Sequence, residues 1–344
     1  MRDCICLRSE SCDILFFKNI YSNNNISMKN TLAIVVPCYN EEDMLPLTVS
    51  KLSDVISSLA NEGLVTDNSF MLLVNDGSKD QTWPLIKKYS NENRFVCGVN
   101  LSGNVGHQNA LMAGLTVAKD NSDITISIDA DLQDDVNVMK QMVLSYIEGY
   151  DIVYGVRDNR DSDTMFKRVT AQGFYKVMKT LGVKTVYNHA DYRLMSKRAV
   201  EYLCEFKERN LFLRGLVPLL GFKSSSVYYK RYERVAGESK YPLRKMLHLA
   251  VDGITSFSVT PVRFVFVLGL IFILVALGIL IYVAISYASH NVVPGWSSLM
   301  LSLWFCSGCV LLCLGIIGEY IGKIYIEIKG RPRYYIAETI INKR

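Results

Sequence analysis

Short apolar runs alternate with polar loops and longer amphipathic stretches between residues 31 and 150. Four runs predict buried strands, because they are rich in β-branched residues and end in polar or acidic positions. They lie at 31–36, 70–74, 96–99 and 124–128. A stretch with helical periodicity follows each run, at about 45–59, 83–89, 109–118 and 136–147. This alternation predicts an α/β fold with a mainly parallel, doubly wound sheet and helices on both faces.

Each predicted strand ends in a polar loop, and the carboxyl ends of parallel strands share the edge of a sheet where ligands bind. The loop after the fourth strand is the most acidic and carries Asp129, Asp131, Gln133, Asp134 and Asp135. Side chains two positions apart in an extended segment point the same way, so Asp129 and Asp131 can share one cation. Carboxylate and amide oxygens suit Mg²⁺ or Mn²⁺, whose shell is often completed by substrate phosphates. An acidic loop that merely caps the next helix is the alternative.

The loops after the first two strands offer hydrogen-bonding groups. Pro37 is expected to close the first strand, because proline cannot donate to a ladder. The carboxylates and amides that follow, including Glu41, Asn75 and Asp76, can hold a base and a ribose. No G-x-G-x-x-G and no G-x-x-x-x-G-K-[ST] follows any of these strands, which disfavours dinucleotide and P-loop sites.

Two uncharged apolar segments, 264–288 and 297–317, set the last third of the chain apart. Each is long enough to cross a bilayer as a helix. The link 290–296 leaves room for a tight turn alone, so we expect a two-helix transmembrane hairpin. Basic residues flank the hairpin on its outer side and none lies in the link, which puts the large domain and both termini in the cytoplasm. Two buried helices of a soluble protein are the alternative.

Composition agrees with a membrane-attached protein. Of the 344 residues, 50% are hydrophobic and 21% are charged, and the net charge of +5 suits a surface of anionic lipid. Three of the nine cysteines, Cys306, Cys309 and Cys313, lie in the second apolar segment and are interpreted as small hydrophobic residues. Residues 1–30 make a poor signal peptide. We therefore expect a disordered or misassigned leader, with Met28 as the natural start.

Two further stretches, 165–181 and 241–258, are amphipathic. Such helices beside a membrane segment lie in the headgroup layer. They would bring the carboxyl edge of the sheet close to the bilayer. An ordinary surface helix packed on the sheet is the alternative for 165–181.

Four motifs, in this order and with the hairpin, resemble the inverting glycosyltransferases of family 2, which have the GT-A fold. The motifs are V-V-P-C-Y-N-E-E at 35–42, N-D-G-S at 75–78 with Asp80 and Thr82, N-V-G-H-Q at 104–108 and D-A-D-L-Q-D at 129–134. More narrowly, the chain is similar to polyprenyl-phosphate glycosyltransferases, such as bactoprenol glucosyltransferases and dolichol-phosphate mannosyltransferases. The resemblance covers about residues 31–335. With the hydropathy it divides the chain into a cytoplasmic GT-A catalytic domain (31–240), a juxtamembrane interface helix (241–262), two transmembrane helices (263–322) and a cytoplasmic tail (323–344).

The resemblance also implies roles for single residues. The nucleotide-sugar pocket would be lined by Pro37, Tyr39, Glu41, Asn75, Asp76 and Asp129. The metal and the diphosphate would be surrounded by Asp129, Asp131 and Gln133. Phosphates would be bound by Arg157, Arg168, Arg234 and Lys240. The family usually has Asp-Asp-Gly-Ser where this chain begins with Asn75, whose amide oxygen accepts a hydrogen bond without charge, so the nucleotide preference stays open.

The expected reaction transfers a hexose, glucose from UDP-glucose, to undecaprenyl phosphate at the cytoplasmic face of the bacterial inner membrane. The acceptor oxygen is already anionic, so positioning and charge neutralisation should dominate catalysis. Arg234 and Lys240 would share the charge of the departing UDP with the metal. Arg157 and Arg168 would align the acceptor phosphate.

Several alternatives stay open. Asp131 or Asp134 could assist as a base if the acceptor is protonated or is a hydroxyl, and His107 is a further candidate that also suits a hydrogen-bonding scaffold. The donor could be GDP-mannose, UDP-GlcNAc or a UDP-aminosugar, and a non-catalytic nucleotide-sugar-binding membrane scaffold is a different class. By analogy the chain could form tetramers, and no nucleic acid partner is expected.

Overall fold

The computed structural model describes residues 29–157, 189–209, 211–230 and 295–341, together with scattered residues between 262 and 285. Several features named above lie outside the described residues. They are the leader up to residue 28, the amphipathic stretches at 165–181 and 241–258, and the side chains of Arg168, Arg234 and Lys240. Predictions for these parts stay predictions.

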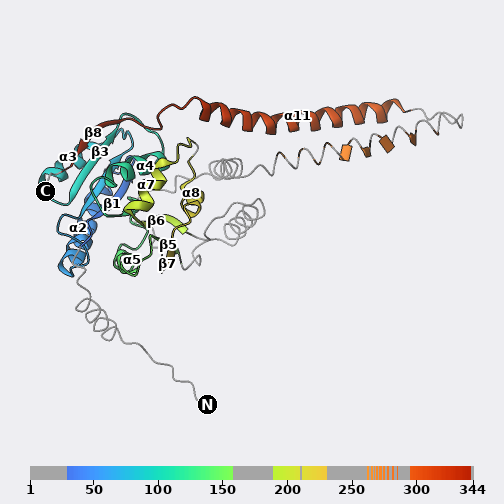
Figure 1. The fold of residues 1–344 in the computed structure, drawn as a ribbon. Coiled ribbons are helices and arrows are strands. Elements are labelled where there is room, and N and C mark those ends of the chain that lie inside the picture. Colours follow the sequence, from blue (N-terminus) through green and yellow to red (C-terminus); the bar gives the residue numbers. More distant parts are fainter. Residues whose placement is uncertain are drawn as a thin grey trace, which may run out of the picture.

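Eight strands form one sheet at the centre of the described domain (Figure 1). They are β1 (Leu32–Cys38), β2 (Phe70–Asn75), β3 (Val96–Leu101), β4 (Ile124–Ser127), β5 (Ile152–Arg157), β6 (His189–Ser196), β7 (Ser224–Tyr229) and β8 (Ile336–Ile340). Their order across the sheet is β7-β5-β6-β4-β1-β2-β3-β8. β1 to β4 run parallel and β5 is parallel to β7, whereas β6 and β8 are antiparallel to their neighbours. The sheet is therefore mixed and mostly parallel.

Helices cover both faces of this sheet. One face packs against α2 (Leu45–Asn61), α3 (Thr82–Glu92) and α5 (Val138–Ile147). The other packs against α4 (His107–Ala118), α7 (Lys197–Glu205) and α8 (Leu213–Leu219). The alternation of side chains along β1 serves both faces, because Ile34 and Val36 belong to the first core and Ala33 and Val35 to the second. The predicted α/β class with helices on both faces is confirmed.

The end of β1 differs from the expectation that Pro37 would close the strand. The strand continues to Cys38, and Pro37 lies opposite Val74 of β2. Proline is tolerated because the pairing of β1 with β4 ends at Val35, so that beyond this point β1 has a partner on one side only. The strand thus carries the next loop, which begins at Tyr39, to the level of the loop after β2.

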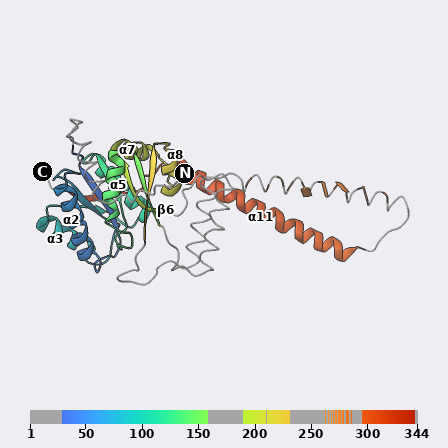
Figure 2. The ribbon, with the colours of Figure 1, turned by 90° about the horizontal axis from the view of Figure 1, so that it is seen from below.

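The second apolar segment forms helix α11 (Trp296–Ile328). Its part Phe305–Ile328 is long and apolar enough to cross a membrane, and the helix extends well beyond the 297–317 segment that hydropathy delimits. It projects away from the domain in both views (Figures 1 and 2). Among the described residues it is the one helix of this kind, so the predicted hairpin stays a prediction.

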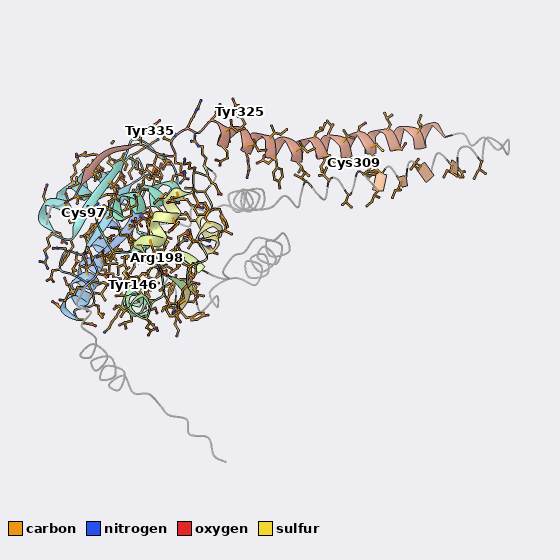
Figure 3. The ribbon with its side chains drawn as sticks, viewed as in Figure 1. Cys97, Tyr146, Arg198, Cys309, Tyr325 and Tyr335 are labelled. Atoms are coloured by element: carbon orange, nitrogen blue, oxygen red, sulfur yellow. The ribbon has the colours of Figure 1, made fainter. Side chains whose placement is uncertain are left out.

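The residues after α11 return to the sheet. β8 pairs antiparallel with β3, and Ile336 lies opposite Leu101 at the carboxyl end of β3. Tyr325 near the end of α11 and Tyr335 just before β8 flank the junction (Figure 3). The sequence pattern predicted a tail here and no strand. Helix α11 is therefore joined to the domain at the edge where the polar loops of the parallel strands lie.

Candidate active site

The loops after β1 and β2 are joined by hydrogen bonds from the backbone of one to the side chains of the other. The N–H of Asn40 donates to Ser78 Oγ at 3.0 Å, and the N–H of Lys79 donates to Asn40 Oδ1 at 2.9 Å. The N–H of Glu41 donates to Thr82 Oγ1 at 3.0 Å. Polar loops with few such bonds open easily, so these cross-links oppose local opening. The two loops form one preformed rim at the edge of the sheet.

The loop after β2 also holds the loop between β3 and α4. Asp76 is 2% exposed and accepts the N–H of Val105 at 2.7 Å and the N–H of Gly106 at 3.0 Å. Burial raises the pKa of Asp76, and these backbone donors act against that rise. Gly77 has a φ of 61°, and a Cβ there would lie 2.5 Å from the backbone N of Asn104. Glycine is required at this turn both by its backbone conformation and by this close approach.

The residues predicted to line a nucleotide pocket lie along this rim. Tyr39 is the most accessible of them, with 41% of its surface exposed, while Glu41 is half-buried and Pro37 is buried. Asn75 is 3% exposed, and its Nδ2 donates to Asn100 Oδ1 of β3 at 2.7 Å. The ring of Tyr39 is therefore accessible for stacking on a base, and the roles of the others stay predictions.

The acidic loop leaves the end of β4 with Asp129 and Asp131 half-buried. Asp129 Oδ1 lies 3.4 Å from Nε2 of His107, the first residue of α4. Thr48 of α2 donates its hydroxyl to the carbonyl of Ala130 at 2.9 Å and so fixes the backbone between the two acids. Burial raises the pKa of Asp129, His107 lowers it, and neighbouring acids raise it further.

Asp134 has a different environment, because it is 3% exposed and its Oδ1 accepts hydrogen bonds from two side chains. Tyr229 of β7 donates its hydroxyl to Asp134 Oδ1 at 2.6 Å. Arg157, at the end of β5, donates Nε and Nη2 to the same oxygen at 3.3 and 3.1 Å. Burial and the charge of Asp134 raise the pKa of Tyr229 far above its ordinary value, so the hydroxyl stays a donor. Arg157 is predicted to bind the acceptor phosphate, and in the structure two of its N–H groups donate to Asp134.

A second buried charge cluster, which the sequence motifs did not assign to the site, lies beside His107. Arg193 is 1% exposed and donates Nη2 to Asp191 Oδ1 at 2.6 Å, and Arg214 of α8 donates Nη2 to Asp191 Oδ2 at 3.1 Å. His107 Nε2 lies 3.8 Å from Asp191 Oδ2 and therefore stands between Asp191 and Asp129. Burial alone raises the pKa of Asp191, but Arg214 and Arg193 hold it far below its ordinary value. The sequence did contain a sign of this cluster: Asp191 and Arg193 are two positions apart, so both side chains lie on the same side of a strand.

The acids at this edge fit a hard divalent cation that arrives with a substrate. Among the described residues, no three His, Cys, Asp or Glu side chains form a ready metal site. Asp129 and Asp131 are half-buried and Gln133 is buried. Carboxylate and amide oxygens are ligands of the kind that Mg²⁺ or Mn²⁺ commonly completes with phosphate oxygens and water. Negative charge accumulates around Asp129, since the neighbouring acids raise its pKa. The donor set therefore fits a cation bound together with a diphosphate.

Comparison with known proteins places these observations in a family context. Residues 33–204 match the family described as Glycosyl transferase family 2. The uncharacterized glycosyltransferase YkoT of Bacillus subtilis is 52% identical over 315 residues, which cover 91% of this chain and 93% of that protein. The bactoprenol glucosyl transferase of Shigella phage SfII is 36% identical over 310 residues, which cover 90% of this chain and 98% of that protein. A mannosyltransferase from Pyrobaculum calidifontis, solved with GDP-Man and Mn²⁺, covers 93% of both chains with a TM-score of 0.42 and 12% identity.

Proposed function

The chain belongs to glycosyltransferase family 2, and from this membership we propose that it transfers glucose from UDP-glucose to undecaprenyl phosphate. The reaction inverts the anomeric centre and takes place at the cytoplasmic face of the bacterial inner membrane. Sequence supports this proposal through the 36% identity to a bactoprenol glucosyl transferase over 90% of this chain. Structure supports it through the position of one apolar helix relative to the acidic loop.

The observation that carries the proposal is that the acidic loop and the end of α11 lie at the same edge of the sheet. β1 to β4 are parallel, so the loop 129–135 leaves the sheet at the edge where β3 ends in Leu101. Ile336 pairs with Leu101 shortly after α11 ends at Ile328. A lipid phosphate in the headgroup layer around α11 therefore approaches the edge that carries the aspartates.

The same connection supports a membrane hairpin. β1 to β7 and β8 belong to one sheet, so the chain leaves and re-enters the domain on one side of the membrane. If α11 crosses the bilayer, a second crossing must precede it, and the apolar segment 264–288 has the required length. The ring of Phe272 in that segment packs 6.0 Å from the ring of Phe305 in α11. Lys323 and Lys329 near the end of α11 give that end the charge of a cytoplasmic flank.

We assign the donor to the preformed rim and the acidic loop. Tyr39, with its accessible ring, stacks on the base, and the amides and acids of the rim hold the base and ribose. Asp129, Asp131 and Gln133 would hold Mg²⁺ or Mn²⁺, which when bound neutralises charge on the departing diphosphate. Because Asp134 is already bound by an arginine and a tyrosine, Asp131 is the stronger candidate for a base.

Acceptor binding is assigned to basic residues. Arg157 uses two of its five N–H donors on Asp134 and keeps three for the acceptor phosphate. Arg168 would bind the same phosphate, and Arg234 and Lys240 would share the charge of the leaving UDP, as the family resemblance implies. Since the acceptor oxygen is anionic, these residues act by alignment and charge neutralisation.

Competition among donors tests the proposal. The purified full chain is incubated with undecaprenyl phosphate, Mn²⁺ and an equimolar mixture of UDP-glucose, UDP-GlcNAc, GDP-mannose and a UDP-aminosugar, and the lipid product is identified by mass spectrometry. We expect the mass of undecaprenyl phosphate plus one hexose, and its loss from a second mixture that lacks UDP-glucose alone, which separates glucose from mannose of equal mass. Transfer of another sugar contradicts the donor assignment. Binding of UDP-glucose without any lipid product favours the non-catalytic scaffold.

A further inference from the structure

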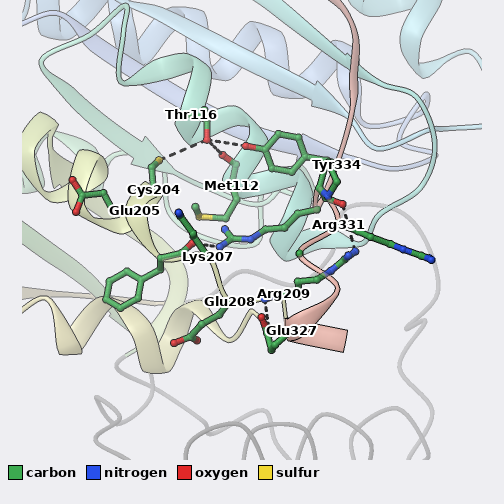
Figure 4. Close-up of a pocket in the computed structure, with 14 residues that line it drawn as sticks. Met112, Thr116, Cys204, Glu205, Lys207, Glu208, Arg209, Glu327, Arg331 and Tyr334 are labelled. Carbon is green, nitrogen blue, oxygen red and sulfur yellow. Dashed lines mark hydrogen bonds between the residues drawn. The ribbon is translucent and has the colours of Figure 1, made fainter. Parts of the chain in front are cut away.

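A cavity of about 850 Å³ lies where residues 329–335, which connect α11 to β8, cross the domain (Figure 4). We call these residues the strap and the cavity the strap pocket. Its described walls come from α4, from the end of α7 and the segment after it, from the end of α11 and from the strap. No residue of the acidic loop 129–135 is among them. The strap pocket is therefore distinct from the candidate active site.

Hydrogen bonds fix the strap pocket in shape. Arg333 of the strap donates to the carbonyl of Phe206, on the segment after α7. Arg209 donates its N–H to Glu327 at 2.7 Å and its Nη2 to the carbonyl of Pro332 at 3.4 Å. These bonds tie the end of the apolar helix and the strap to the domain, so the pocket is preformed.

The charge of the strap pocket is positive. Four basic and three acidic residues line it. Glu327 already accepts a backbone N–H, and burial together with Glu327 raises the pKa of Glu208, which favours the neutral form of Glu208. Lys207 and Arg331 are both exposed and form no ion pair or hydrogen bond within the described part of the chain. Glu205 is also exposed and forms no ion pair or hydrogen bond within the described residues, so the lining keeps one net positive charge, with Lys207 and Arg331 available to attract an anion.

An apolar groove of about 540 Å³ adjoins the strap pocket and shares Glu205 and Phe206 with it. Its other described walls are mostly apolar and include Tyr202, Leu219 and Phe222. Tyr202 is 53% exposed and Leu219 is 52% exposed. A cationic pocket that continues into an apolar groove matches an amphiphile with a phosphate head and a hydrocarbon chain.

We infer that the strap pocket binds the phosphate of an anionic glycerophospholipid from the surrounding bilayer, with one acyl chain along the groove. This inference rests on the proposed membrane location of α11, which ends at the pocket and sets it at headgroup level. Basic residues at that level attract anionic lipid. A soluble phosphate ester would leave the groove unused. The acceptor must reach Asp129, whereas Thr116 on the pocket wall lies about 13 Å along α4 from His107, the contact of Asp129.

Native mass spectrometry of the full chain released from nanodiscs tests this inference. The nanodiscs contain phosphatidylglycerol and phosphatidylcholine in equal amounts. We expect the chain to retain phosphatidylglycerol, and the double variant Lys207→Gln with Arg331→Gln to retain roughly tenfold less, because the lipid phosphate loses its charge-assisted hydrogen bonds inside the pocket. The matched control, Lys323→Gln with Lys329→Gln, removes the same charge near the end of α11 from two residues that do not line the pocket, and it should retain as much as the unmodified chain.

Two results overturn the inference. Equal losses in both double variants show general attraction to the membrane surface, and displacement of the retained phospholipid by equimolar undecaprenyl phosphate assigns the pocket to the acceptor. Failure of the proposed function is distinguishable from these results. A chain that does not enter nanodiscs contradicts the membrane location, whereas a chain that enters them without preference for phosphatidylglycerol contradicts the strap pocket alone.

Discussion

Four acids at the carboxyl edge of the sheet divide into two pairs with different surroundings. Asp134 and Asp191 are 3% and 9% exposed, and each accepts a hydrogen bond of 2.6 Å, from a tyrosine and from an arginine. Asp129 and Asp131 are half-buried, and the side chain of Asp129 keeps 38% of its surface exposed. Buried acids with strong donors hold the site together, whereas the half-buried acids can be reached by a cation or a substrate. The sequence motif alone does not separate the two kinds.

Asp191→Asn tests the buried pair and should have the largest effect. It leaves the guanidinium of Arg193, which is 1% exposed, without its charge partner. Breaking one side of a buried pair costs about 3–5 kcal/mol, and we expect a loss of that order in the free energy of unfolding, measured by urea denaturation in detergent. Glu338→Gln is the control, because it breaks an exposed 2.7 Å pair with Lys87 and should cost less than about 1 kcal/mol. Equal losses of unfolding free energy in both variants would contradict the view that Asp191 stabilises the fold more than an exposed acid does.

Asp131→Asn tests the accessible pair and should show the opposite pattern. We expect kcat/KM for UDP-glucose to fall by about 10²- to 10³-fold, the range for losing one group that stabilises developing charge. The free energy of unfolding should change by less than about 0.5 kcal/mol, as at other sites away from buried networks. Kinetics at several Mn²⁺ concentrations and urea denaturation of the same preparation measure both quantities. Unchanged activity, or a stability loss as large as that of Asp191→Asn, would contradict the division into two kinds of acid.

The fold was predictable to the extent that single segments determine it. The runs that became β1 to β4 are apolar and β-branched, and helical periodicity follows each, so the parallel half of the sheet could be predicted from local patterns. β8 could not, because its five residues are mostly exposed and owe their conformation to β3. The antiparallel direction of β6 is likewise set by its neighbours.

The site was predictable where its residues are close in sequence. The loops after β1, β2 and β4 could be named from their motifs, and the structure brings them to one edge. Their supports come from far along the chain, since Tyr229 lies 95 positions from Asp134 and Thr48 lies 82 positions from Ala130. Only the folded sheet brings such pairs together, so the sequence could not show which acids are engaged.

Gly77→Ala tests the loop that carries a further buried acid, Asp76, whose carboxylate accepts backbone N–H groups. Its Cβ would meet the backbone of residues 103 and 104 at 2.5 Å, and its φ is 61°. We expect the free energy of unfolding to fall by about 1–3 kcal/mol, the cost of a strained backbone position. KM for UDP-glucose should also rise, because the rim loops move apart. Gly103→Ala is the control, since a Cβ there meets nothing within 4 Å, and equal effects would mean that the turn tolerates a side chain.

Tyr229→Phe tests whether a buried donor positions the acidic loop. The change removes the 2.6 Å hydrogen bond to Asp134 and should cost about 1 kcal/mol of unfolding free energy. We also expect the Mn²⁺ concentration for half-maximal activity to rise a few-fold, because Asp134 directly follows the proposed metal ligand Gln133 and a shift of Asp134 would displace that ligand. Tyr228→Phe, at a neighbouring residue that is 64% exposed, should change neither quantity. A stability loss with an unaltered Mn²⁺ dependence would limit Tyr229 to a structural role.

The smallest expected effect concerns Asp151, a carboxylate whose partner is exposed. The hydrogen bond from Arg198 lowers the pKa of Asp151, although burial opposes the shift, and Ser196 adds to the lowering. Because the folded-state pKa lies below the unfolded value of about 3.9, the contribution to stability is complete above that pH and is lost as the pH falls through the folded-state pKa. The sign is the same for Asp191, whose pKa its arginines also lower.

Salt should separate these two carboxylates. The Arg198 side chain is 63% exposed, so about 1 M NaCl should screen its attraction to Asp151, whereas the buried pair of Asp191 should be screened much less. We therefore expect Arg198→Gln to reduce the acid sensitivity of the thermal unfolding midpoint at low salt and to change it little at high salt. Midpoints measured from about pH 5 to pH 2 in both salts check this expectation. Arg198→Gln and the unmodified chain could still differ at high salt. That result would mean that the exposure of Arg198 does not make its ion pair with Asp151 sensitive to salt.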